Sequence, residues 1–169
     1  MRRVECLCAA VALILMAAPG QAAERPDDPA LAKVFSLMNK ARAKPQMCGS
    51  KLRPPAKRLR YDADLSVAAQ LHAGDMAANN YFSHDSLDGR TFIDRIAATS
   101  FEGAPAGENL ASGQQTPAEV IQAWLESPPH CRNLMAKKFD AVGLGLALFH
   151  DPQYSTPTTY WVQDFGYLD

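Results

Sequence analysis

The segment from Gly107 to Gly145 constrains the fold of this chain more than any other, because a carboxylate, a helix, a histidine and a strand follow one another within it. It begins with Gly107-Glu108-Asn109 and passes through an amphipathic helix around Trp124. His130 follows a Pro-Pro break, and an apolar run with spaced glycines then predicts a strand. Glu108 and His130 each stand where an element ends, so we expect their side chains to reach one pocket.

His84 is a third candidate for the same pocket. It lies in Tyr81-Phe82-Ser83-His84-Asp85, directly after another predicted helix. Ser83, His84 and Asp85 are the residue types of a hydrolytic triad, but sequence neighbours cannot align as nucleophile, base and orienting group. We therefore predict a site formed by His84, Glu108 and His130, and we assign no catalytic residue.

The N-terminal residues 1–22 have the pattern of a signal peptide. Arg2 and Arg3 precede an apolar run from Cys6 to Ala18, and small residues then lead to a cleavage position after Ala22. The run is too short for a spanning helix, and it has no following cysteine to carry a lipid anchor. We expect a periplasmic or secreted protein whose mature chain, residues 23–169, is one soluble domain without an integral membrane segment.

The charge of the chain gives no indication of nucleic acid binding. The formal net charge is −1, and the basic residues cluster only at Lys51-Leu52-Arg53 and at Lys57-Arg58-Leu59-Arg60. We interpret these clusters as parts of a solvated loop, and we predict no nucleic acid partner.

Two cysteines remain in the predicted mature chain, Cys48 and Cys131. In an oxidising compartment an isolated pair favours one disulfide bond, because a free thiol survives poorly there. The alternative is two unpaired thiols, one of them buried.

Helical periodicity and breaker residues predict four helices and about three strands. The helices are expected at residues 29–43, 62–79, 90–99 and 116–126, and the strands at 108–111, 141–149 and 160–165. The segment between the first two helices is expected to be a surface loop. Because the elements do not alternate as βαβ units, they favour an antiparallel α+β layered domain.

Three further polar residues are interpreted as ordinary structure. His72 lies beside the apolar stripe of its helix, which predicts a half-buried histidine with satisfied hydrogen bonds. Glu126 lies about 200° from Trp124 around its helix, so it is expected to point to solvent, away from the cleft. His150 is interpreted as a loop histidine.

Five short motifs occur in one order between Leu31 and the C-terminus. They are Phe82-Ser83-His84, Gly107-Glu108-Asn109, Trp124 through His130, Phe139 through Gly145, and Tyr160 through Gly166. Each motif alone is weak, but together they are specific. In this order they resemble the bacterial, SCP-like branch of the CAP superfamily, which includes cysteine-rich secretory proteins, venom allergens and plant pathogenesis-related proteins.

The resemblance implies a three-layer α-β-α sandwich with a small antiparallel sheet and a cleft lined by two histidines and two glutamates. His84, Glu108 and His130 match three of these four positions. Relatives usually carry the fourth three residues after the tryptophan, where this chain has Ser127. Glu126 stands one position earlier, so the fourth member is not identified.

The function that we expect from this cleft is binding rather than catalysis. Family members of this type are implicated in lipid binding, so the leading hypothesis is an exported module for a lipid, a sterol or an envelope component. His84 and His130 could also hold a divalent cation such as zinc, since imidazole nitrogens are common ligands of that ion. The alternatives are a metal-dependent hydrolase and a structural or interaction module without catalysis.

Overall fold

A four-stranded sheet forms the centre of the computed structural model, which describes residues 25–168. The strands are β3 (Arg60–Tyr61), β4 (Ala104–Ser112), β5 (Ala141–Phe149) and β6 (Thr158–Tyr167), in the order β3-β5-β6-β4. β6 is antiparallel to both of its neighbours, whereas the two-residue β3, which was not predicted, pairs in parallel with β5. β4 therefore forms one outer edge of the sheet.

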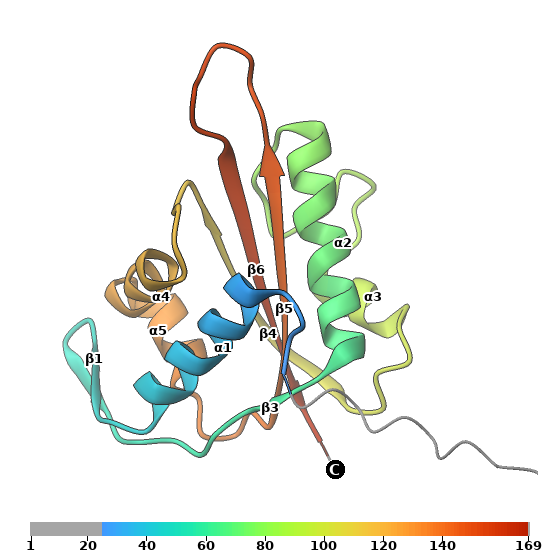
Figure 1. The fold of residues 1–169 in the computed structure, drawn as a ribbon. Coiled ribbons are helices and arrows are strands. Elements are labelled where there is room, and N and C mark those ends of the chain that lie inside the picture. The colour runs from blue at the N-terminus through green and yellow to red at the C-terminus, as the bar shows by residue number, and fades with distance from the viewer. Residues whose placement is uncertain (1–24, 169) are drawn as a thin grey trace, which may run out of the picture.

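Helices cover both faces of this sheet (Figure 1). On one side lie α2 (Ala63–Asn79) and α3 (Phe92–Ala97). On the other lie α1 (Pro29–Arg42), α4 (Pro117–Glu126) and α5 (Pro128–Leu134). The loop between β5 and β6 projects beyond the layers. The α-β-α sandwich and the α+β class are thus confirmed.

Side-chain caps set the start of the longer helices. Asp28 and Asp62 accept hydrogen bonds from backbone N–H groups in the first turns of α1 and α2. At α3 and α4 the caps are Thr91 and Thr116, each in a reciprocal capping box with the acidic residue three positions later. The starts predicted at Asp62 and Thr116 are therefore confirmed.

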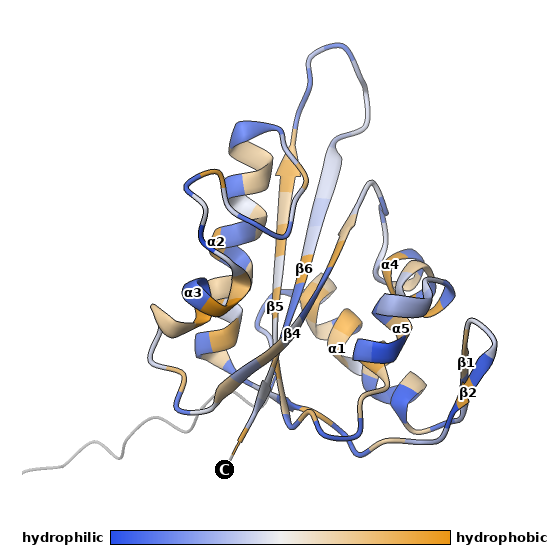
Figure 2. Ribbon diagram, turned by 180° about the vertical axis from the view of Figure 1, so that it is seen from behind, coloured by the Kyte–Doolittle hydropathy of each residue, from blue (hydrophilic) through white to orange (hydrophobic). Residues whose placement is uncertain are grey.

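The core consists of separate apolar clusters on the two faces of the sheet, because alternate strand residues point to opposite sides. Ala111, Leu144 and Trp161 face α1, α4 and α5. Leu110, Tyr160 and Val162 face α2. Figure 2 shows the apolar colour concentrated where the helices meet the strands.

The structure differs from the sequence prediction beside the disulfide. A surface loop was predicted before Arg60, but β1 (Gln46–Cys48) and β2 (Lys51–Arg53) pair there as an antiparallel hairpin around Gly49, whose φ of +66° suits glycine. The break predicted at Pro128-Pro129 is confirmed, since α4 ends at Glu126. The helix α5 that follows was not predicted, and the two prolines occupy its first turn, where their missing N–H groups cost nothing. The Cys48–Cys131 bond, with 5.3 Å between the two Cα atoms, confirms the predicted pairing and ties the hairpin to α5.

No helix within residues 25–168 has the length and apolar character needed to cross a bilayer. The predicted signal peptide lies outside the described residues.

Candidate functional site at the outer strand

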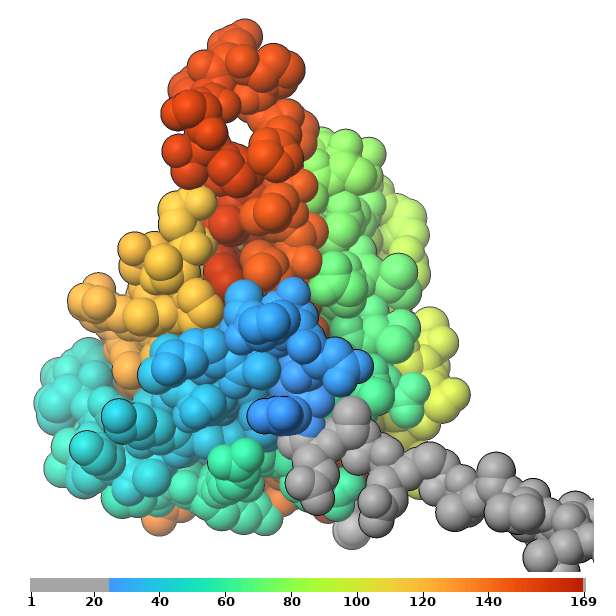
Figure 3. All heavy atoms as spheres, viewed as in Figure 1, coloured from blue at the N-terminus to red at the C-terminus, as the bar shows by residue number. Residues whose placement is uncertain are grey.

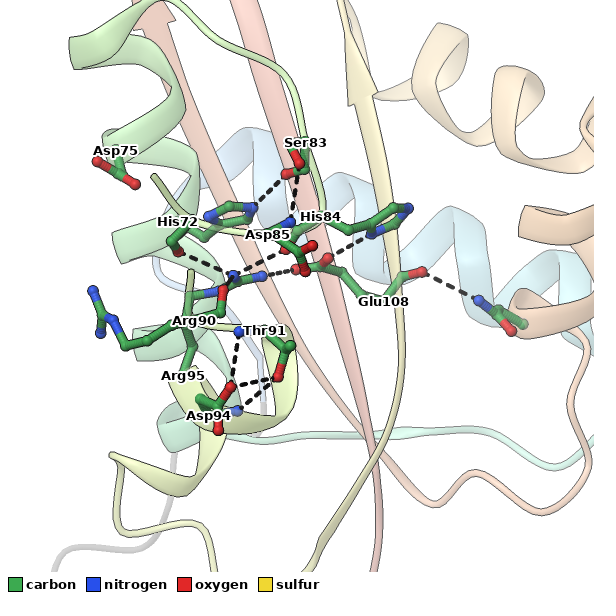
Figure 4. Close-up of polar contacts among 12 residues, drawn as sticks. His72, Asp75, Ser83, His84, Asp85, Arg90, Thr91, Asp94, Arg95 and Glu108 are labelled. Carbon is green, nitrogen blue, oxygen red and sulfur yellow. Dashed lines mark hydrogen bonds and ion pairs between the residues drawn. The ribbon is translucent and has the colours of Figure 1, made fainter. Parts of the chain in front are cut away.

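Glu108 is the buried centre of a polar cluster on strand β4. The strand places its side chain on the face toward α2 and α3, where only 1% of it is exposed. His84 Nδ1 contacts Glu108 Oε1 at 2.6 Å, and Arg95 Nη2 donates to Glu108 Oε2 at 2.6 Å. Both carboxylate oxygens are therefore engaged by cationic or ionisable side chains (Figure 4).

His84 lies in the segment that connects α2 with α3. Its side chain is 56% exposed, while the carboxylate that holds it is almost completely buried. In Figure 4 the ring of His84 extends from this segment toward strand β4, on the side away from α2. Because Nδ1 is held by Glu108, the ring orientation is fixed and Nε2 is left for an external partner.

Arg95 is a site residue that the sequence reasoning missed. It comes from α3 and is 5% exposed. Its Nη1 donates to the carbonyl oxygens of His84 and Arg90 at 3.0 and 3.1 Å, and to Ser86 Oγ at 3.1 Å. One guanidinium thus shapes the loop that carries His84 and also pairs with Glu108. The available signal was the position of Arg95 one residue before the inward-facing Ile96, on the apolar side of a short helix.

Asp164 is the second missed member of this cluster. It is directly opposite Glu108 in the pairing of β4 with β6, and it is fully buried. Burial, and then the negative charge of Glu108, raise the pKa of Asp164 well above its usual value. Neither oxygen of Asp164 has a hydrogen-bond donor among the described residues, so contact with Glu108 needs a proton on Asp164. A carboxylic acid inside a buried strand was the available signal.

His130 lies in α5, on the other side of β4 from Arg95. Its carbonyl oxygen accepts a hydrogen bond from Asn109 Nδ2 at 3.2 Å. Asn133, one turn further along α5, donates to the backbone oxygen of Glu108 at 3.2 Å and to Asn109 Oδ1 at 3.0 Å. These amide contacts attach α5 to the strand residues beside Glu108, and so fix His130 near this edge of the sheet.

The exposed His84 and the half-buried His130 have pKa values shifted in opposite directions. The hydrogen bond that His84 donates to Glu108 raises the pKa of His84 above its usual value, against a smaller effect of burial. Burial, and then the charge of His84, lower the pKa of His130. His84 contacts Glu108, and the backbone of His130 contacts the next strand residue, Asn109, so both histidines are attached to the same part of β4. At a pH between the two pKa values, His84 is therefore an imidazolium and His130 a neutral imidazole, and the two flank β4.

The other polar residues lie outside this cluster or act within the fold. Glu126 is exposed and accepts a hydrogen bond from Gln122, as the helical wheel predicted. His150 is an exposed residue of the β5–β6 loop. His72 is more buried than predicted, at 1% exposed, because it packs beneath the loop of His84 with its Nε2 on the Ser83 carbonyl at 2.9 Å. Burial lowers its pKa, so it is neutral and donates this bond. Its hydrogen bonds are only partly satisfied, since Nδ1 has no partner among the described residues.

No group of three or more His, Cys, Asp and Glu side chains within residues 25–168 is arranged to hold a metal ion. Glu108 is already engaged by His84 and Arg95, so among the described residues the predicted metal ligands His84 and His130 do not form part of a larger ligand group.

The sequence pattern of the CAP, or cysteine-rich secretory protein, family matches residues 35–165. The chain belongs to the CAP family. Its relatives include the uncharacterized protein YkwD of Bacillus subtilis, which is 32% identical over 133 residues, or 79% of this chain and 45% of YkwD. A second B. subtilis protein, the uncharacterized membrane protein YlbC, is 30% identical over 53% of this chain and 26% of its own. The CAP chain thus spans less than half the length of these relatives.

Solved structures show the same fold. An extracellular protein of Bacillus anthracis with an SCP domain superposes with a TM-score of 0.65 at 29% identity, over 80% of this chain and 39% of the other. An outer surface protein of Borrelia burgdorferi also gives a TM-score of 0.65, at 22% identity, over 88% of this chain and all of the other. The resemblance to the bacterial SCP-like branch is therefore confirmed.

Proposed function

We propose that this CAP protein is exported and binds a small amphipathic ligand, such as a lipid, a sterol or an envelope component, at His84 and His130 on the edge of β4. Support for export comes from the N-terminal pattern and from the extracellular and outer-surface relatives. The ligand is expected to bring a polar head to the imidazoles.

A buried ion pair beneath an exposed imidazole carries this proposal. Burying a charged pair costs desolvation energy that apolar packing would avoid, so Glu108 and Arg95 add little net stability. Their contacts instead hold His84 at the surface with one nitrogen fixed. Such preorganisation is useful for recognition, because less side-chain freedom is lost on binding.

The surroundings of the two histidines suit a ligand with an apolar part. Phe82, two residues before His84, exposes 53% of its surface, and Pro129 beside His130 is also exposed. His84 in its charged form donates to a carboxylate, phosphate or hydroxyl oxygen. A divalent cation such as zinc would find only two protein ligands here, one fewer than catalytic zinc sites use, so the bound ligand or waters would complete its coordination.

Mass spectrometry of small molecules that co-purify with the protein tests the proposal. We expect the wild type and the His150→Ala control to retain a ligand, and His84→Ala and His130→Ala to bind it about tenfold or more weakly, the loss typical of a charge-assisted hydrogen bond. Identical molecules at identical occupancy in all four proteins would refute a role for the edge of β4.

The pH dependence separates a polar head group from a cation. Binding of an oxygen head group should weaken as the pH rises through the raised pKa of His84, because the imidazolium is lost. Zinc binding should instead strengthen over that range, since a protonated imidazole cannot coordinate a metal. Calorimetric titration of the recovered ligand and of zinc, each at several pH values, makes this measurement.

A further inference from the structure

The basic side chains of this chain are concentrated in its N-terminal part. Residues 29–61 contain nine Lys and Arg residues and no Asp or Glu, whereas residues 62–168 contain thirteen acidic and five basic residues. The basic segment includes the β1–β2 hairpin, which Figure 3 shows in turquoise at the lower left margin of the molecule. The cations of the hairpin therefore have no carboxylate among their neighbours in sequence.

A hollow of about 340 Å³ lies between this hairpin and α5, and three cations line it. Lys51 and Arg53 come from β2, and Arg132 comes from α5. Because Lys51 and Arg53 are two residues apart on one strand, their side chains leave the same face of the hairpin. The other lining residues are Cys48, Gly49, Ser50 and Pro128, so no carboxylate of the described residues lines the hollow.

The disulfide bond holds the three cations together. Lys51 is directly opposite Cys48 in the hairpin. The bond from Cys48 reaches Cys131, which directly precedes Arg132. The turn at Gly49 also packs on the start of α5, because an added Cβ atom would lie 3.2 Å from a proline ring there. Like charges that line one hollow repel each other, so this arrangement raises the free energy of the folded protein unless an anion neutralises it.

None of the three cations has a salt bridge within residues 25–168. By contrast, Lys57, Arg90 and Arg95 each pair with a carboxylate. Nε of Arg53 is moreover buried without a hydrogen-bond partner, so this guanidinium has lost water without gaining an acceptor from the protein. A partly buried guanidinium of this kind, beside two further unpaired cations, is the arrangement expected of an anion site.

We propose that this hollow binds a phosphate dianion, either free phosphate or the end group of a phosphomonoester, through Lys51, Arg53 and Arg132. Near neutral pH such a group carries a charge of about −1.5 to −2 and at least three acceptor oxygens, which matches three cations. The two guanidinium groups can each donate to two of these oxygens, and the ammonium group adds a point charge. A carboxylate, with one charge and two oxygens, would leave part of the cationic charge unpaired.

The hollow is separate from the ligand site proposed on β4. Arg132 follows His130 by two residues, about 200° around α5, so the two side chains leave the helix on opposite sides. His84 and Glu108 do not line the hollow. The phosphate site therefore does not depend on the function proposed for His84 and His130.

Isothermal titration calorimetry at low ionic strength tests the proposal. Inorganic phosphate and glycerol 3-phosphate are the probes, and acetate at matched ionic strength is the control for an anion of lower charge. We expect saturable binding of the phosphate probes at one site per chain, and no comparable heat from acetate. Lys51→Gln, Arg53→Gln and Arg132→Gln should each bind about tenfold more weakly or worse, the loss typical of one hydrogen bond between charged groups.

Charge reversal gives a second readout, which a merely structural role of the cations would not produce. Lys51→Glu places a carboxylate beside the two remaining guanidinium groups, so it should abolish phosphate binding while raising the unfolding midpoint of the ligand-free protein. Lys33→Gln is the matched control, because Lys33 is an exposed cation of α1 that does not line the hollow. It should bind phosphate as the wild type does.

The two probes distinguish the sources of the phosphate group. Binding of inorganic phosphate would show that free phosphate is sufficient, and binding of glycerol 3-phosphate alone would identify a phosphomonoester of a larger molecule; either result supports the site. Three results would overturn it. They are no saturable binding of either probe, equal binding of acetate, and undiminished binding by the three glutamine variants and by Lys51→Glu.

Discussion

At the scale of single residues, the site depends on two carboxyl groups that cannot both be charged. Glu108 and Asp164 face each other across β4 and β6, and one guanidinium, from Arg95, contacts Glu108. Burial and then the charge of Glu108 raise the pKa of Asp164, which favours its protonated form, while Glu108 pairs with Arg95 and His84. The exposed imidazole of His84 is therefore held by Glu108, next to the carboxyl group of Asp164, whose neutral form is favoured.

Asp164→Asn should stabilise the protein above about pH 5. An amide N–H group can donate to Glu108 at any pH in this range, whereas a carboxyl group can do so only when it is protonated. The pKa of Asp164 is higher in the folded than in the unfolded protein. The contribution of Asp164 to the stability of the wild type is therefore complete below the unfolded pKa of about 3.9, and it is lost as the pH rises through the folded pKa. His84 changes stability in the same direction at higher pH, so the difference between the two proteins isolates Asp164.

Urea denaturation at a series of pH values measures this difference. The gain for Asp164→Asn should vanish near pH 3 and reach about 1–3 kcal/mol in neutral solution, the size typical of satisfying a buried polar group. Asp151→Asn, in the β5–β6 loop, should show no such gain. A mutant curve parallel to the wild type throughout would mean that Asp164 does not titrate as argued.

The sequence indicated some members of the site more readily than others. Glu108 and His84 stand in recognisable motifs, and the structure places them in contact. Arg95 and Asp164 escaped because each occupies a position that periodicity assigns to the apolar core. The rule that buried positions are apolar fails where a polar network replaces packing, and the sequence alone does not show which buried charges have partners.

At the scale of elements, helix α2 lies unusually close to strand β5. A Cβ atom added at Gly143 would lie 2.1 Å from the backbone carbon of Leu65, and one at Gly145 would lie 2.4 Å from that of Ala69. Backbone atoms cannot move aside as a flexible side chain can. The glycines of this strand therefore set the distance between the sheet and the helix that leads to the His84 loop.

Gly143→Ala should destabilise the protein by about 3 kcal/mol or more, because α2 must shift to admit the methyl group. Gly74→Ala is the matched control, since Gly74 lies within α2 and no atom lies within 4 Å of its added Cβ. There the same change should stabilise by about 0.5–1 kcal/mol through helix propensity. Chemical denaturation of both variants measures the two effects, and losses of equal size would contradict this view of the α2–β5 contact.

Long elements were predicted better than short ones. Helices α1, α2 and α4 and strands β5 and β6 carry enough periodic residues to identify them, whereas the three-residue strands β1 and β2 do not complete a pattern. The hairpin is stabilised by contacts from outside its own sequence, namely the bond to Cys131 and packing on α5. Local sequence gives no measure of such long-range restraints.

At the scale of the whole molecule, two buried links join the N-terminal segment to α5. Arg42, at the end of α1, donates to the carbonyl oxygen of Leu134 at 2.6 Å, and burial lowers its pKa to about 10. The second link is the disulfide between Cys48 and Cys131, which are separated by 83 residues. The loop that it closes contains α2, α3, β4 and α4, so it crosses the whole sandwich.

Removing this disulfide should lower the free energy of unfolding without changing the fold. A loop of this length gives at most about 4–5 kcal/mol on the chain-entropy model, and residual structure in the reduced chain makes the effect smaller. Cys48→Ala/Cys131→Ala tests this without leaving thiols, and alanine avoids burying a hydroxyl at two sites that are nearly inaccessible. Urea denaturation of the double variant should show a loss of a few kcal/mol, and reduction of the wild type should reproduce most of it.

Since the core on both faces of the sheet is untouched, the variant should still unfold in one cooperative transition. An unchanged midpoint would show that the crosslink contributes nothing to the stability of the folded state.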